Sequence, residues 1–213
     1  MSDEKRDFDK EAAAWDEHPA RVQLAGDVTA AISRQVVLSA DMDVLDFGCG
    51  TGLVTLRLAP LVKSITGVDS SRGMLNVLVA KVAKQDVTNV RTLLLDLEAG
   101  DALSDEYDLI VSNMTLHHIR EVGPLLARFY KAISPGGHLC LCDLDLDDGL
   151  FHDDNQGVFH PGFDRAILRR VFMDAGFEDV RDTTAAEVTK PTRLGGLRRF
   201  TIFLMTGLKR SAG

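Results

Sequence analysis

Short apolar segments alternate with longer amphipathic segments through the middle of the chain. The apolar segments are rich in Val, Ile and Leu and have the length of buried strands. The predicted strands cover residues 43–47, 64–68, 90–95, 107–112 and 137–143. Helices are predicted between them at residues 52–59, 71–84 and 122–133. An alternation of strand and helix predicts a parallel sheet with right-handed crossovers.

Further elements flank this alternation on both sides. Helices are predicted at residues 7–17, 20–39 and 162–175, and strands at residues 177–189 and 198–208. The first of these helices is rich in Ala and is expected to end near Pro19. Residues 134–137 (Ser-Pro-Gly-Gly) predict a turn, because proline stops a helix and glycine permits the reversal into the next strand.

Composition and charge narrow the class of protein. The chain has 213 residues, 45% of them hydrophobic and 26% charged, which suits one globular domain. Its net charge of −8 argues against a broad nucleic-acid surface, because phosphate contacts need clustered Lys and Arg. The apolar runs are shorter than the roughly 18 residues of a membrane span. Three cysteines make no disulfide framework, so a cytoplasmic location is expected. A monomer or homodimer is expected as the default state of such a chain.

The most specific feature of the sequence is a glycine-rich turn at residues 44–52. A predicted strand runs there into three glycines at alternate positions, which lets the backbone come close to a ligand. A dinucleotide-binding turn has the spacing G-x-G-x-x-G, but Leu53 stands where its third glycine would be. Asp46, just before the first glycine, would repel a diphosphate and suits a cationic ligand or an amino group. The turn therefore argues against a nicotinamide-dependent oxidoreductase.

Polar residues also end the next three predicted strands, at Asp69, Asp96 and Asn113. With the glycine-rich turn, this series resembles the class I S-adenosylmethionine-dependent methyltransferases, in particular the small-molecule enzymes of methyltransferase types 11 and 12. The resemblance implies a Rossmann-like α/β fold with a seven-stranded, mostly parallel sheet. Its strand order would be 3-2-1-4-5-7-6, with strand seven antiparallel and helices on both faces. It also divides the chain into an N-terminal helical lid, residues 1–40, and one methyltransferase domain, residues 41–213.

The resemblance implies S-adenosylmethionine as cofactor and assigns its contacts. Asp46 would lie below the methionine part, and Asp69 would accept both ribose hydroxyls. The predicted cofactor-binding residues are Asp46, Gly48, Cys49, Gly50, Asp69, Ser70, Met74, Asp96, Leu97, Ser112 and Asn113. Asp96 is expected at the adenine amino group, although an acid at a strand end can instead cap a helix. Met74 can equally belong to the core.

Methyl transfer from a sulfonium is an in-line displacement, so alignment of the reactants can supply most of the catalysis. A general base is needed only if the acceptor arrives protonated. His117 and His118 follow the fourth predicted strand and are the candidate catalytic residues. The alternative is that they pack against or cap the following helix.

A polar loop at residues 151–163 is the second candidate for acceptor chemistry. His152, Asp153 and His160 are predicted to bind a small-molecule substrate, and Trp15 would join them if the N-terminal lid closes. Imidazole and carboxylate are also metal ligands, but this spacing matches no metal signature, so no metal is predicted. The acceptor stays open, and a cofactor-binding protein without turnover is the alternative function.

Overall fold

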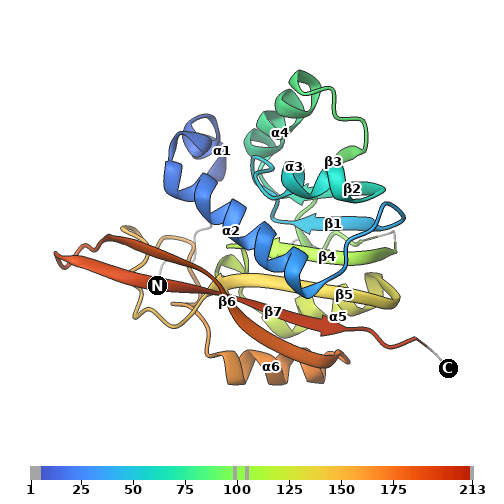
Figure 1. The fold of residues 1–213 in the computed structure, drawn as a ribbon. Coiled ribbons are helices and arrows are strands. Elements are labelled where there is room, and N and C mark those ends of the chain that lie inside the picture. Colours follow the sequence, from blue (N-terminus) through green and yellow to red (C-terminus); the bar gives the residue numbers. More distant parts are fainter. Residues whose placement is uncertain (1–5, 98–99, 104–105, 212–213) are drawn as a thin grey trace.

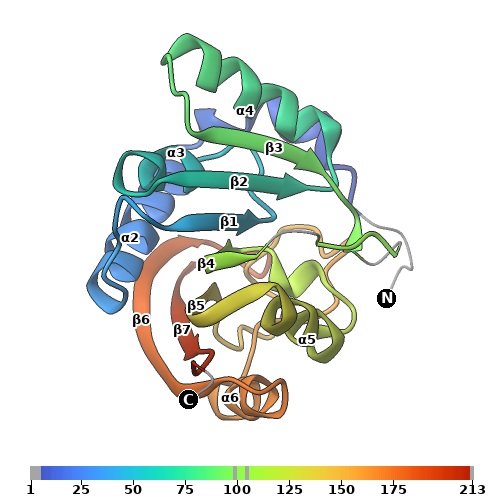
Figure 2. The same ribbon diagram turned by 90° about the vertical axis from the view of Figure 1, so that its right-hand side faces the viewer.

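The computed structural model describes residues 6–97, 100–103 and 106–211. Its strands are β1 (Asp43–Phe47), β2 (Ser64–Asp69), β3 (Val90–Leu94), β4 (Tyr107–Asn113), β5 (Ile133–Leu144), β6 (Glu178–Pro191) and β7 (Leu197–Leu208). In the described part of the chain they form one seven-stranded sheet in the order β3-β2-β1-β4-β5-β7-β6 (Figure 1, Figure 2). Neighbouring strands from β3 to β5 are parallel, and β7 is antiparallel to β5 and β6. The predicted fold class and strand order are confirmed.

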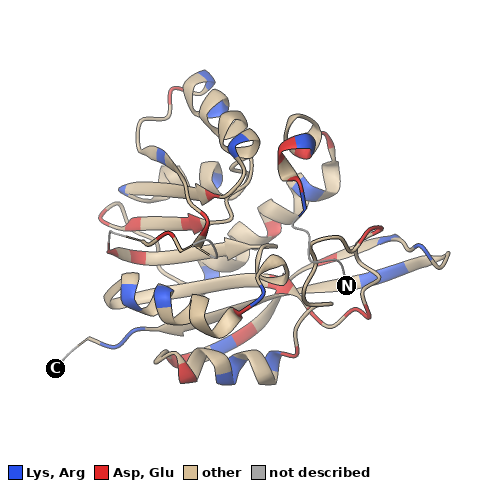
Figure 3. Ribbon diagram, turned by 180° about the vertical axis from the view of Figure 1, so that it is seen from behind, with Lys and Arg blue, Asp and Glu red and all other residues tan. Residues whose placement is uncertain are grey.

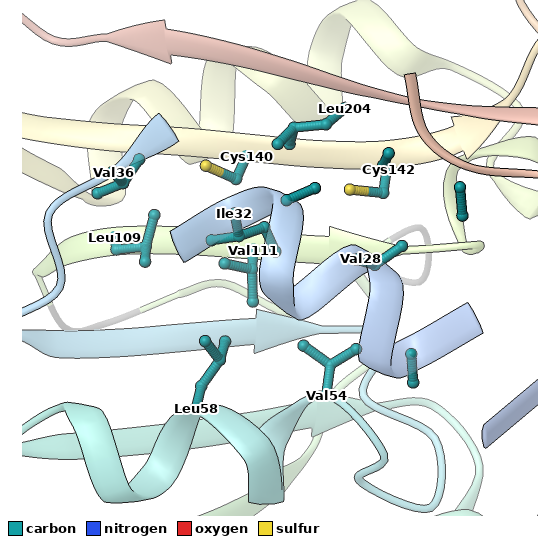
Figure 4. Packing of buried hydrophobic residues seen from close by; sticks show 14 of the residues in the cluster. Val28, Ile32, Val36, Val54, Leu58, Leu109, Val111, Cys140, Cys142 and Leu204 are labelled. Atoms are coloured by element: carbon teal, nitrogen blue, oxygen red, sulfur yellow. The ribbon is translucent and has the colours of Figure 1, made fainter. Parts of the chain in front are cut away.

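One face of the sheet is covered by α2 (Pro19–Gln35) and α3 (Thr55–Leu58). Val28 and Ile32 of α2, with Val36 just after it, extend toward the side chains of β4 and β5, where Cys140 and Cys142 are buried (Figure 4). The helix α4 (Arg72–Lys84) packs beside them over β2 and β3 (Figure 2). Both cysteines therefore serve the core.

The opposite face is covered by α5 (Val122–Ala132) and α6 (Arg165–Asp174). Phe129 of α5 and Phe172 of α6 are fully buried against this side of the sheet. The ring of Phe129 meets that of Phe47 edge to face, with centroids 5.1 Å apart. Full burial of one such side chain is worth about 1.5–3 kcal/mol, so α5 fixes β1 just before the glycine-rich turn.

Several element boundaries differ from those predicted. The helix predicted at residues 52–59 is shortened to α3, followed by the 3₁₀ helix η2 (Ala59–Leu61), because Gly52 has a φ of +81° and Pro60 interrupts the helix. The helix predicted to reach residue 39 ends at Gln35, since Val36 has extended backbone.

Proline and glycine account for two further differences. The preceding helical segment ends at Glu17, near Pro19 as predicted. Pro19 itself begins α2, one residue earlier than predicted, because proline suits the first turn, where its missing N–H is not needed. Residues 134–137 are assigned to β5 but bulge out of its pairing with β4, since Ile133 pairs with Tyr107 and His138 with Leu109. Gly136 there has a φ of +86° and donates to the Lys209 carbonyl, so the chain stays paired with the end of β7.

The N-terminal segment consists of α1 (Phe8–Glu11) and the 3₁₀ helix η1 (Ala12–Glu17), while residues 1–5 lie outside the described part. The carboxylate of Asp9 accepts hydrogen bonds from Ser71 Oγ at 2.5 Å and from the Gly73 amide at 2.7 Å. Asp16 accepts from Thr51 Oγ1 at 2.6 Å and pairs with Lys81 at 2.7 Å. These bonds hold the segment over the glycine-rich turn and the start of α4.

Charged residues are spread over the outer elements of the structure. Lys and Arg lie on α4, α5, α6 and the β6–β7 hairpin, interspersed with Asp and Glu (Figure 3). In the part of the chain described, no helix has the length and apolar character needed to cross a bilayer.

Candidate functional site

A cavity of about 1050 Å³ lies at the carboxyl ends of β1, β2 and β4. Its lining comes from the glycine-rich turn, the N-terminal segment, the loop after β5 and the end of β6. Open α/β sheets bind ligands at this edge, where the strand order reverses. Small-molecule pockets commonly measure about 300–1,000 Å³, so this cavity has room for a large ligand and a second, smaller one.

The glycine-rich turn forms the floor of the cavity. Gly48, Gly50 and Gly52 have φ values of +69°, +54° and +81°, which an L side chain rarely adopts. The amides of Gly48 and Cys49 donate to the Val68 carbonyl at 2.8 and 3.0 Å, fixing the turn to β2. The turn therefore presents backbone atoms to the cavity at its glycines, and its hydrogen bonds to β2 hold it in place.

Substitution of Gly48 by alanine is expected to lower the free energy of unfolding by about 1–3 kcal/mol. A Cβ at Gly48 would overlap the side chain of Thr115, and the positive φ adds backbone strain. Urea unfolding of both proteins measures the difference. Gly26→Ala is the control, since its Cβ would come no closer than 3.8 Å to Arg57, and it should be neutral or stabilising. Equal destabilisation by the two changes would contradict this explanation.

Asp46 is buried at the end of β1, with 1% of its surface exposed. Its Oδ2 accepts a hydrogen bond from Thr55 Oγ1 at 2.6 Å. Burial raises the pKa of Asp46 to about 7. The hydrogen bond from Thr55 opposes this increase, and the neighbouring negative charge of Asp69 adds to it. A cationic ligand in the cavity would favour the ionised form of this carboxyl.

Asp69 ends β2 and connects the glycine-rich turn to the start of α4. Its two oxygens accept from the Gly50 amide and the Ser71 amide, each at 2.8 Å. Burial raises the pKa of Asp69, while these hydrogen bonds lower it in part. Each carboxylate oxygen can accept more than one hydrogen bond, so the group can also receive ligand hydroxyls. Ser70 and Met74 line the cavity beside it, and Met74 is at the same time a core residue with 2% exposure.

The ends of β3 and β4 complete this part of the cavity. Asp96 and Leu97 line it, and the Leu97 carbonyl accepts from Arg128 at 2.5 Å. Asn113 also lines it, and its Oδ1 is buried with no hydrogen-bond partner among the described residues. Ser112 does not line the cavity, since its hydroxyl donates to the Phe47 carbonyl at 2.8 Å inside the sheet. The buried Asn113 oxygen is a vacant acceptor suited to a ligand N–H or ammonium group.

The two predicted catalytic histidines lie in the same cavity. His117 is buried, and its Nδ1 lies 2.7 Å from Asp143 Oδ1. Nδ1 of His118 donates to the Gly157 carbonyl at 2.7 Å. Burial and the neighbouring His117 lower the pKa of His118 to about 3, and the same causes lower the pKa of His152 to about 3. Burial alone would raise the pKa of Asp143, but His117 holds it below its usual value.

The predicted substrate residues separate into two groups. Trp15, His152 and Asp153 line the cavity. The Trp15 ring stacks under the Arg21 guanidinium at 3.7 Å, and the Asp153 side chain is 81% exposed. His160 lies outside the lining, with its Nε2 bonded to the Ile119 carbonyl at 2.9 Å.

Sequence reasoning missed several residues of the site. Asp143 is the second-last residue of β5, so the rule that drew attention to the ends of the earlier strands could have identified it as a site residue. Thr55 beside Asp46 and the hairpin residues Val188 and Lys190 carry no local signal, because only the fold brings them to the cavity.

Three comparisons place this geometry among known proteins. A protein family described as a methyltransferase domain matches residues 44–137. An uncharacterized methyltransferase of Schizosaccharomyces pombe is 33% identical over 127 residues, covering 56% of this chain and 43% of that protein. The trans-aconitate 2-methyltransferase of Deinococcus radiodurans is 39% identical over 102 residues, covering 46% of this chain and 36% of that one. The alignments thus span about half or less of these relatives.

Among solved structures, the YcgJ protein of Bacillus subtilis superposes with a TM-score of 0.72 at 17% sequence identity. The superposition covers 87% of this chain and 99% of that structure. This likeness independently supports the strand order described above.

Proposed function

The chain carries a class I S-adenosylmethionine-dependent methyltransferase domain, and on this premise we propose that it transfers a methyl group from that cofactor to a small-molecule acceptor. When bound, the cofactor supplies a methyl group on a positively charged sulfur. The main support for the proposal is that Asp46, Asp69 and Asn113 line one cavity together with the glycine-rich turn. The missing G-x-x-G spacing disfavours the nicotinamide alternative.

The donor groups suit the chemistry of this cofactor. Asp69 offers two oxygens on one rigid group, which is what the two hydroxyls of a ribose require. The partnerless Oδ1 of Asn113 suits the amino group of a methionine moiety. The buried carboxyl of Asp46 would be stabilised in its charged form by a nearby cation.

Alignment is the main catalytic contribution that we assign to this chain. Rigid contacts at the turn and the strand ends fix one reactant, and the walls of the cavity orient the other. Such positioning can supply about 7–11 kcal/mol of barrier lowering. His117 and His118 face the same cavity and are the groups available to bind or deprotonate the acceptor.

We assign residues 1–40 to an N-terminal lid segment, in which α1 and η1 lie at the cavity while α2 packs on the sheet, and residues 41–213 to the catalytic domain. Phe8 supports this assignment, because its ring contacts both Trp15 and His118, with centroids 6.0 and 5.1 Å away. Arg6, Phe8 and Trp15 all line the cavity. A closed lid limits the acceptor to a size that fits inside, which favours a small molecule.

Calorimetry with S-adenosylhomocysteine and transfer of labelled methyl groups test the proposal. We expect one binding site per chain, and labelled product when the purified protein and labelled cofactor are incubated with a metabolite extract. Boiled protein is the control for transfer. Folded protein that binds no S-adenosylhomocysteine would refute the proposed cofactor. Binding without transfer to any acceptor would favour the alternative of a cofactor-binding protein without turnover.

A further inference from the structure

Three histidine rings meet at one place in the cavity, although they come from two distant parts of the chain. His117 and His118 follow β4, and His152 belongs to the loop after β5. One ring nitrogen of each lies within 4.8 Å of the other two. Nε2 of His117 is 3.1 Å from Nε2 of His152. The described residues therefore place three imidazoles around a common point.

Hydrogen bonds behind the rings fix which nitrogens face that point. Nδ1 of His117 donates to Asp143, and Nδ1 of His118 donates to the Gly157 carbonyl, each at 2.7 Å. An ionised carboxylate and a carbonyl only accept, so in each neutral ring Nδ1 carries the hydrogen and Nε2 presents a lone pair. Metal-bound histidines almost always have such an outer partner on their other nitrogen.

We propose that His117, His118 and His152 bind a divalent first-row transition metal ion, with zinc as the best match. Three protein ligands with a fourth, open position are the usual arrangement of a catalytic zinc site. Tetrahedral bonds of about 2.05 Å separate two ligand nitrogens by about 3.4 Å. His117 and His152 are already at 3.1 Å, and a ring nitrogen of His118 lies within 4.8 Å of the other two.

The competing explanation is a hydrogen-bonded cluster in which His152 donates to His117. The count of hydrogen-bond donors and lone pairs in the cluster favours a metal ion. Both rings that follow β4 have Nδ1 occupied by an acceptor, so in the neutral rings both Nε2 atoms carry a lone pair and no hydrogen. One N–H from His152 can satisfy only one of these lone pairs, whereas one cation satisfies both.

The open position of this site would face the cavity, because all three histidines line it. Its role in catalysis rests on the proposed function. A thiol or hydroxyl acceptor would bind the ion as an anion and release its proton to solvent, since a bound cation lowers the pKa of its ligand. The histidines would then orient and activate the acceptor without a general base.

The test uses the metal alone, without cofactor or acceptor. Co²⁺ is titrated into tag-free, metal-stripped protein and followed by its visible absorption, and Zn²⁺ is then added. We expect one Co²⁺ per chain with the spectrum of a four- or five-coordinate nitrogen site, displaced by Zn²⁺. His152→Ala should weaken Co²⁺ binding at least about 100-fold, because loss of an outer partner alone costs about 10–100-fold. Asp143→Asn should weaken Co²⁺ binding by about 10–100-fold.

His160→Gln is the matched control, because His160 lies in the same loop and a glutamine can still donate to the Ile119 carbonyl. Circular dichroism establishes that each variant is folded, and His152→Asn replaces His152→Ala if that variant is not. Folded wild-type protein that binds neither Co²⁺ nor Zn²⁺ overturns the proposal, and so does unchanged binding in the folded His152 variant. Because no cofactor is present, this outcome is independent of methyl transfer.

Discussion

Substitution of Asp69 by alanine is expected to weaken binding of S-adenosylhomocysteine at least about 100-fold. The change removes an acceptor for two ribose hydroxyls, and each hydrogen bond to a charged group is worth about 1.5–3 kcal/mol. It also removes the acceptors of the Gly50 and Ser71 amides, so the turn loses its attachment to α4. Titration calorimetry measures the affinity directly.

Two further variants separate binding from folding in this experiment. Asp69→Asn keeps one carbonyl oxygen in place and should lose less affinity than alanine. Asp174→Asn changes an acid at the end of α6, outside the cavity lining, and should bind like wild type. Wild-type affinity in a folded Asp69→Ala protein would remove this residue from the cofactor site.

Asp46→Asn is expected to stabilise the ligand-free protein, and increasingly so as the pH rises. The pKa of Asp46 is about 7 in the folded chain and 3.8 ordinarily, so the unfolded chain releases this proton first. Raising the pH from about 4 to 7 therefore costs the wild type stability, and above pH 7 the loss is complete. A difference of about three pKa units corresponds to a loss of at most about 4 kcal/mol in the free energy of unfolding. The Asp46→Asn protein avoids this loss because asparagine does not ionise.

Thermal unfolding from pH 4.5 to pH 8 provides the measurement. The gap in stability between the variant and the wild type should widen up to about pH 7 and then stay constant. Asp41→Asn, an exposed acid in the turn before β1, should show no widening gap. A constant gap in the Asp46→Asn protein would mean that Asp46 is ionised throughout. The same variant should bind S-adenosylmethionine more weakly, because it lacks the negative charge that favours a nearby cationic sulfonium.

Local pattern was sufficient to predict the alternation of strands and helices and the polar residues at the strand ends, whereas the order of the strands was implied by the family resemblance. Buried parallel strands are short apolar runs, and their ends carry the residues that face a ligand, so Asp46, Asp69 and Asn113 could be named from the sequence. Ser112, one residue before Asn113, points into the sheet because side chains alternate along a strand.

The other side of the cavity could not be predicted in the same way. His117 and His152 are 35 residues apart and share no repeating pattern, and their contact depends on the path of the loop after β5. The predicted substrate loop likewise divides, with His152 at the cavity and His160 turned to Ile119. Such loops have no periodicity from which the direction of a side chain could be read.

The long β6–β7 hairpin has a consequence for how this protein could diversify. Its β6 strand begins at the edge of the sheet and brings Val188, Thr189 and Lys190 to the cavity, where Lys190 donates to the Phe151 carbonyl. The residues assigned to the cofactor lie instead within residues 46–113. Under the proposed function, mutations in the hairpin and its neighbouring loop would therefore change which methyl acceptor binds, while the residues assigned to the cofactor stay unchanged. Grafting this hairpin between homologues offers a route to exchange specificity.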